Sequence, residues 1–279
     1  MVVAMRDLFD QRAHFDTFGF VVLRGALTGG EVTRLRAEGD RAIRDATGAH
    51  YRVDIGLGGM TGHYIPATGA RTPESVALLQ RFAPLTERLL GRPVLPSATQ
   101  HALLFDTSGW HADTTHGVPS LKVAAYFDEL DGDNGALRVL PGSHRLPESD
   151  LAPFLNRPEF DDEATWREAI RQVPAHVIVS RPGDVIVFDE HLWHAAVNGS
   201  YRMQWSSGYV IDPITSDEDA QVRDCLASQF VPGMALDYDP AHYPHFGDLF
   251  RAVCPPRWVT QLDRLGAFAA AAAEQRVSR

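Results

Sequence analysis

A succession of short apolar segments, each closed by a turn, constrains the fold of this chain more than any other feature. Strand-like segments occur at 99–106, 121–128, 136–140, 176–180, 184–188 and 203–211. Turn signals separate them, including the glycine-containing run 131–135, Pro141-Gly142 and Pro182-Gly183. A run of strands interrupted in this way is typical of a β-sandwich or jelly roll.

Helices are predicted before this β-rich stretch. Thr28 and Glu31 have the spacing of a capping box, so a helix is expected to begin there and to extend to about residue 46. A second helix is expected over 73–90, closed by Gly91 and Pro93. Upstream of both, a short helix is expected to lead through a glycine into a first strand.

The whole chain is expected to form one domain, because β-rich domains often reach this length. Its predicted parts are a mainly helical segment over about 1–95, a β-rich core over about 96–212 with a partly helical insert, and a C-terminal loop and helix over 213–279. The glycine-rich stretch 48–72 is expected to be an irregular loop, and its segment 56–69 is the candidate lid over a binding site.

Composition limits the classes of function. The 279 residues carry a formal net charge of −10, which argues against nucleic acid as a partner because phosphate binding needs a basic face. No apolar run reaches the roughly 20 residues that span a membrane, and no signal peptide is expected at the first residues. Cys225 and Cys254 are too few for a disulfide framework, which favours a reducing, cytoplasmic compartment.

Three side chains near the ends of the predicted strands form a ligand set for iron. His111 and Asp113 are two residues apart, so on a strand they would point to the same face. His194 follows much later, after the apolar strand at 184–188. Two imidazoles and one carboxylate hold non-haem Fe(II) on one face of an octahedron and leave the other positions open. The third ligand must come from a distant strand folded alongside. His191 is a weaker alternative for this third position.

Arg202, at an offset of eight from His194, indicates an acidic cosubstrate. Its planar guanidinium can bind a carboxylate through two parallel hydrogen bonds. Further candidates for cosubstrate binding are the polar residues Gln100, Thr114, Lys122 and Ser206. Candidates for substrate contact are the neighbours of the ligands, Trp110, His116 and Trp193. The alternative is a structural role: a solvated strand face for Lys122 and core packing for the two tryptophans.

These segments resemble the phytanoyl-CoA dioxygenase family of Fe(II)- and 2-oxoglutarate-dependent oxygenases. Residues 15–24 resemble the N-terminal segment of that family, and Trp110-His111-Ala112-Asp113 resembles its metal triplet. Residues 131–144, which end in Pro-Gly-Ser-His, are similar to its most specific signature. Residues 181–194 resemble the strand before its second histidine. The resemblance covers most of the chain.

This resemblance implies a double-stranded β-helix, a cupin-like jelly roll that is mainly β with flanking helices. It implies Fe(II), 2-oxoglutarate and O₂ as cofactor and cosubstrates, with Arg202 on the far carboxylate of 2-oxoglutarate. The expected reaction is oxidation, foremost hydroxylation, of a small-molecule substrate with release of succinate and CO₂, in secondary metabolism. Because the carboxylate ligand Asp113 is present, hydroxylation is favoured over the halogenation carried out by relatives that lack it.

Two other functions stay open at this point. The offset between His194 and Arg202 is shorter than the spacing usual in that family, which would suit a cupin-like metalloenzyme that does not use 2-oxoglutarate. A non-catalytic jelly-roll binding module is the other alternative, although the complete ligand set argues against it. The identity of the substrate and the oligomeric state do not follow from the sequence.

Overall fold

In the part of the chain that the structure describes, eight antiparallel strands form the centre of the molecule. The computed structural model describes residues 5–45, 61–155, 162–229 and 238–277. Its strands are β1 (Phe20–Leu23), β2 (Thr61–Pro66), β3 (Val94–His111), β4 (Ser120–Tyr126), β5 (Leu137–Val139), β6 (His176–Ile178), β7 (Val185–Asp189) and β8 (His194–Ile211). Their order in space is β1-β7-β4-β8-β3-β2, and β5 joins β8 to β6. This arrangement, together with the helices around it, confirms the predicted mainly-β fold.

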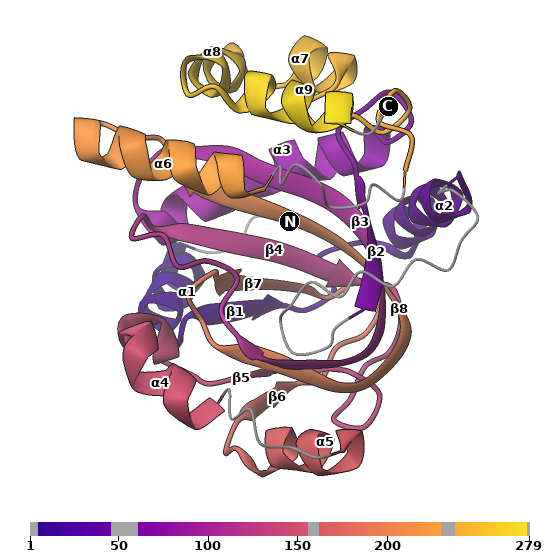
Figure 1. The fold of residues 1–279 in the computed structure, drawn as a ribbon, viewed down its shortest axis with the longest axis vertical. Helices are drawn as coiled ribbons and strands as arrows, with labels where there is room; N and C mark the ends of the chain where they lie inside the picture. Colours follow the sequence, from indigo (N-terminus) through magenta and orange to yellow (C-terminus); the bar gives the residue numbers. More distant parts are fainter. Residues whose placement is uncertain (1–4, 46–60, 156–161, 230–237, 278–279) are drawn as a thin grey trace.

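The long strands β3 and β8 bend and connect two layers of strands (Figure 1). The later part of β8 pairs with β4, whereas its first residues pair with β5. Between these parts the register of β3 against β8 shifts repeatedly near Asp106, and Asn198 and Tyr201 have positive φ angles of 60° and 54°. Non-glycine residues with such angles are uncommon and mark a sharp change of strand direction. The bend therefore closes the sheet over an interior space.

Strand alternation divides the apolar residues between this interior and the outer face of the larger layer. On β7, Ile186 and Phe188 belong to the cluster between the layers, whereas Val185 and Val187 belong to the cluster under the helices. On β8, Met203 and Trp205 pack into the same outer cluster. The residues that alternate with Met203 and Trp205 along β8 therefore point inward, because successive side chains on a strand point to opposite faces.

Helices cover both outer faces (Figure 1). The larger layer is covered mainly by α2 (Gly29–Asp45), α3 (Pro73–Leu90), α6 (Ser216–Ser228), α7 (Asp248–Val253), α8 (Pro256–Arg264) and α9 (Ala267–Val277), while α1 (Met5–Phe18) precedes β1. The β5–β6 side carries α4 (Glu148–Leu155) and α5 (Glu163–Gln172), which follow the short 3₁₀ helix η1 (Ser143–Arg145). None of the described helices is long and apolar enough to cross a membrane.

The local signals for the first helices are confirmed. The backbone N–H of Thr28 donates to the Glu31 carboxylate at 2.7 Å, and the N–H of Glu31 donates to the Thr28 hydroxyl at 3.3 Å, which completes the capping box. Helix α3 ends at Gly91, whose φ of 70° lies in the left-handed region that favours glycine.

Two loop predictions are wrong. Residues 61–66 of the supposed loop 48–72 form β2, because the edge of β3 supplies a pairing partner that the sequence does not show. The candidate lid 56–69 therefore includes this strand, and its first part lies outside the described residues. The supposed loop after residue 213 contains α6 and α7, and the predicted last helix is divided into α8 and α9 at Gly266, where φ is 81°.

Candidate metal centre

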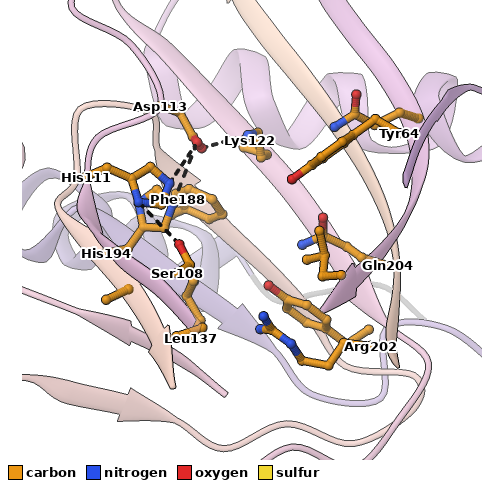
Figure 2. A pocket seen from close by; sticks show the side chains of 15 residues that line it. Tyr64, Ser108, His111, Asp113, Lys122, Leu137, Phe188, His194, Arg202 and Gln204 are labelled. Carbon is orange, nitrogen blue, oxygen red and sulfur yellow. Dashed lines mark hydrogen bonds and ion pairs between the residues drawn. The ribbon is translucent and has the colours of Figure 1, made fainter. Parts of the chain in front are cut away.

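The three predicted metal ligands lie together at one end of the interior (Figure 2). His111 ends β3 and His194 begins β8, and the two residues are direct partners across these strands. Asp113 Oδ1 lies 3.7 Å from Nε2 of each histidine. One ligand atom from each residue falls within 4.8 Å of the others. Pairing of two distant strands therefore brings the ligand set into one cluster.

Backbone carbonyls fix the orientation of both imidazoles. Nδ1 of His111 donates to the Gly109 carbonyl at 2.8 Å, and Nδ1 of His194 donates to the Leu192 carbonyl at 2.8 Å. Because a carbonyl only accepts, each Nδ1 carries a proton, which leaves Nε2 as the ring nitrogen available to a metal ion. Burial, followed by the neighbouring His111, lowers the pKa of His194 to about 4, so its ring is neutral at physiological pH.

Asp113 completes the set as a carboxylate. Burial by itself would raise its pKa, but Lys122 and then the two histidines hold the pKa of Asp113 well below its usual range. Its Oδ2 accepts a hydrogen bond from Lys122 Nζ at 2.7 Å, and its Oδ1 faces the two histidines. Two imidazole nitrogens and one carboxylate oxygen suit non-haem Fe(II), so the residues present fit this ion.

Arg202 lies in the same pocket, on the side away from the triad (Figure 2). Only 2% of its surface is exposed. Nη1 donates to the Gly135 carbonyl at 2.6 Å and Nη2 to the Asp106 carbonyl at 3.3 Å, whereas the buried Nε has no partner in the described part of the chain. Within the described part of the chain, no carboxylate forms an ion pair with this guanidinium. A buried cation without a carboxylate indicates an anionic ligand, because an uncompensated buried charge is costly.

The remaining candidates for cosubstrate binding differ in position. Gln100 and Lys122 line the pocket, and Lys122 is hydrogen-bonded to Asp113. Thr114 and Ser206 are not among the described residues that line it. The hydroxyl of Thr114 accepts a hydrogen bond from the N–H of His116 at 3.2 Å, and Ser206 is buried in β8 opposite Gln100.

The candidates for substrate contact lie outside this lining. Trp110 and Trp193 pack with Ile170 of α5 in an apolar cluster on the outer face of the smaller layer. Each tryptophan directly precedes a metal-ligand histidine, so strand alternation turns its indole away from the pocket. His116 Nε2 lies 3.4 Å from the Ser228 hydroxyl of α6. The structure therefore shows a packing role for both tryptophans.

His191 is excluded as the third ligand by its hydrogen bonds. Its Nδ1 lies 2.8 Å from Asp189 Oδ1, and its Nε2 lies 2.6 Å from the backbone carbonyl of His116. Both ring nitrogens are therefore occupied by protein acceptors.

Several residues of the pocket were missed from the sequence. The lining also includes Tyr64, Ser108, Tyr126, Phe188 and Gln204. Gln204 carried a usable signal, because it lies two residues after Arg202 and so faces the same side of β8. Tyr64 was hidden because β2 was interpreted as a loop.

Comparison with known proteins agrees with this geometry. The family model described as phytanoyl-CoA dioxygenase matches residues 15–200. This chain belongs to the phytanoyl-CoA dioxygenase family. Family membership identifies it as a dioxygenase-type enzyme that depends on Fe(II) and 2-oxoglutarate. A comparison with curated protein sequences finds no match.

Solved structures share the fold, which confirms the predicted jelly roll. The non-haem α-ketoglutarate-dependent epimerase SnoN from nogalamycin biosynthesis is 23% identical, with a TM-score of 0.58 over 77% of this chain and 88% of that chain. The carbocyclase SnoK from the same biosynthesis is 19% identical, with a TM-score of 0.55 over 73% and 83%. EctD from S. alaskensis with bound Fe is 26% identical, with a TM-score of 0.52 over 75% and 77%.

Proposed function

We propose that this family member hydroxylates a small-molecule substrate in secondary metabolism, with conversion of 2-oxoglutarate and O₂ to succinate and CO₂. The observation that carries the proposal is the buried Arg202, which has no carboxylate partner among the described residues and lies in the same pocket as the His111–Asp113–His194 cluster. One pocket thus offers a site for a metal ion and a separate site for an anion.

In this proposal the protein binds and orients, and the bound group performs the oxidation. Nε2 of His111, Nε2 of His194 and Oδ1 of Asp113 would hold the iron, which supplies the oxidising chemistry when cosubstrate and O₂ are bound. Arg202 would pair with the far carboxylate of 2-oxoglutarate. The pocket also carries the apolar side chains of Leu104, Leu137 and Phe188.

The structural neighbours support a small-molecule substrate. One structure of SnoN holds Fe³⁺, α-ketoglutarate and nogalamycin RO, and one structure of EctD holds 2-oxoglutarate and 5-hydroxyectoine. For this chain, neutral polar groups on Tyr64, Gln100 and Gln204 line the pocket and can orient such a substrate. Both cysteines are free and buried, which supports a reducing, cytoplasmic compartment.

Anaerobic titration with Fe(II) and 2-oxoglutarate tests the proposal. The chelate of the two has a weak visible charge-transfer band, which we expect in the wild type and not in His111→Ala. Arg202→Ala should weaken 2-oxoglutarate binding by about 10–100-fold, as expected for loss of a charge-assisted hydrogen bond, without loss of iron binding.

Arg181→Ala is the matched control, because the Arg181 side chain is 79% exposed and lies outside the pocket. Tight iron binding without the charge-transfer band would contradict the role of 2-oxoglutarate and favour the cupin-like alternative. Failure to bind iron would favour the non-catalytic binding module.

A further inference from the structure

Lys122 is the single lysine among the 26 lysine and arginine residues of the chain. Every other basic position carries a planar guanidinium, whereas this one carries a compact ammonium on a flexible stem. The ammonium lies inside the pocket, 2.7 Å from Asp113 Oδ2 (Figure 2). The one lysine ammonium of the chain is therefore hydrogen-bonded to the carboxylate of the ligand Asp113.

The fold builds a site for this ammonium. Lys122 lies on β4 between Phe188 of β7 and Gly208 of β8. Its Nζ lies 6.0 Å from the centre of the Phe188 ring. A Cβ at position 208 would collide with Ser97 Oγ and would lie 3.0 Å from Glu190 Oε1, so the glycine leaves room for these two buried side chains beside Lys122.

Glu190 contributes to the site through its backbone. Its backbone carbonyl accepts the N–H of Asp113 at 2.8 Å. The hydrogen bonds from Lys122 and to Glu190 thus hold the side chain and the backbone of Asp113, respectively.

We propose that Lys122 is a positioning residue that restricts Asp113 to a single metal-facing oxygen. With Oδ2 bound to Lys122, only Oδ1 faces the two histidine nitrogens, at 3.7 Å from each. A carboxylate that used both oxygens would occupy one more coordination position, and the ligand set of this type works through its open positions. This inference rests on the proposed metal site and gives Lys122 a role other than cosubstrate binding.

Metal binding in the absence of 2-oxoglutarate tests this role. Co(II) is the probe, because its visible spectrum reports the number and geometry of its ligands and it needs no protection from oxidation. In Lys122→Met, Co(II) affinity should fall by about 10–100-fold, the range for loss of a partner of a metal ligand, and the spectrum should change. The affinity falls because the freed carboxylate can rotate away from the position in which Oδ1 faces the two histidines.

A chemical rescue controls for folding. Lys122→Cys should behave like Lys122→Met, and alkylation with 2-bromoethylamine should restore an ammonium of nearly the same length and return the wild-type affinity and spectrum. The same treatment of the wild type is the matched control, because Cys225 and Cys254 are buried.

Other outcomes overturn the inference. If Lys122→Met leaves the Co(II) spectrum and affinity unchanged, or raises the affinity, Lys122 does not position Asp113. If in addition the affinity for 2-oxoglutarate falls, Lys122 is a cosubstrate ligand. Failure of the proposed function would instead show in the wild type, as absence of Co(II) or 2-oxoglutarate binding.

Discussion

Two glycines shape the position of the Arg202 guanidinium. A Cβ at position 199 would lie 1.9 Å from Arg202 Nε, and a Cβ at position 135 would lie 2.6 Å from Arg202 Cδ. Gly135 also has a φ of 100°, so any side chain there is strained. The arginine can therefore lie against the backbone of two segments and still face the pocket.

At the residue scale, Gly199→Ala should impair the anion site without removing its cation. The added methyl group must displace the guanidinium, so 2-oxoglutarate affinity should fall by about tenfold or more, as for loss of a charge-assisted hydrogen bond. Isothermal titration calorimetry with 2-oxoglutarate measures this loss of affinity. A separate titration with Co(II) should give an unchanged affinity. Gly30→Ala is the control, because its Cβ would make only an ordinary contact at 3.5 Å. Equal 2-oxoglutarate affinities in the two variants would contradict the prediction.

At the element scale, α3 is capped by a residue of another helix. Its own N-cap residue, Thr72, makes no side-chain cap hydrogen bond. Instead the Glu38 carboxylate of α2 accepts the backbone N–H groups of Glu74 at 2.9 Å and Ser75 at 3.1 Å. His101 Nε2 of β3 lies 3.1 Å from the same carboxylate. A single buried side chain thus joins two helices and the central sheet.

Glu38→Ala should lower the free energy of unfolding by about 3 kcal/mol, because it leaves buried donors and the His101 ring without their acceptor. Urea denaturation followed by circular dichroism measures the loss. Glu168→Ala is the control, since the Glu168 side chain is 58% exposed, and it should change stability by less than about 0.5 kcal/mol. A loss below about 1 kcal/mol for Glu38→Ala would show that water or a rearranged side chain replaces the cap.

A second link between elements depends on pH. Asp184, just before β7, accepts the N–H of Gly25 at 2.9 Å and the Arg24 guanidinium at 2.7 Å, both just after β1. Burial would raise its pKa, but these bonds and the N–H of Arg181 hold the pKa of Asp184 below its usual value. The Asp184 carboxylate therefore stabilises the fold fully above the unfolded-state pKa of about 3.9. This stabilisation is lost as the pH falls through the lower pKa of the folded state.

Asp184→Asn should therefore destabilise the protein most near pH 7, and the difference from the wild type should shrink below about pH 4. Urea denaturation over this pH range is the measurement. Asp10→Asn serves as the control, because Asp10 is exposed and this variant should keep wild-type stability over the same pH range. A difference that grows on acidification would contradict the assigned direction.

At the scale of the whole molecule, the metal site joins the two long strands where they meet. Binding to the folded state alone should therefore stabilise the entire barrel. At a free Co(II) concentration of 100 times Kd, the gain is about 2.7 kcal/mol, which corresponds to roughly 5–10 °C in Tm for a protein of this size. Differential scanning calorimetry measures the shift.

His194→Ala should abolish this shift, whereas His242→Ala should retain it, because His242 is a half-exposed histidine outside the cluster. Equal shifts in both variants would mean that Co(II) stabilises the protein through other sites.

Features with local causes were predicted correctly from the sequence. The Thr28–Glu31 capping box and the Gly91 helix end depend on contacts within a few residues. The elements that were missed are those stabilised from outside. Helix α6 offers only Val222, Cys225 and Leu226 as buried residues, too few for a periodic apolar pattern. Strand β2 depends on the edge of β3.

By itself, the sequence determined the candidate metal ligands, the family and the class of fold, because residue types, motifs and turn signals can be seen along the chain. Only the tertiary structure decided that Lys122 contacts Asp113, that Arg202 is buried without a carboxylate among the described residues, and that Trp110 faces away from the pocket. The reason is strand register. A shift of one residue moves a side chain to the other face of a sheet, and register between distant strands is set by packing of the whole barrel.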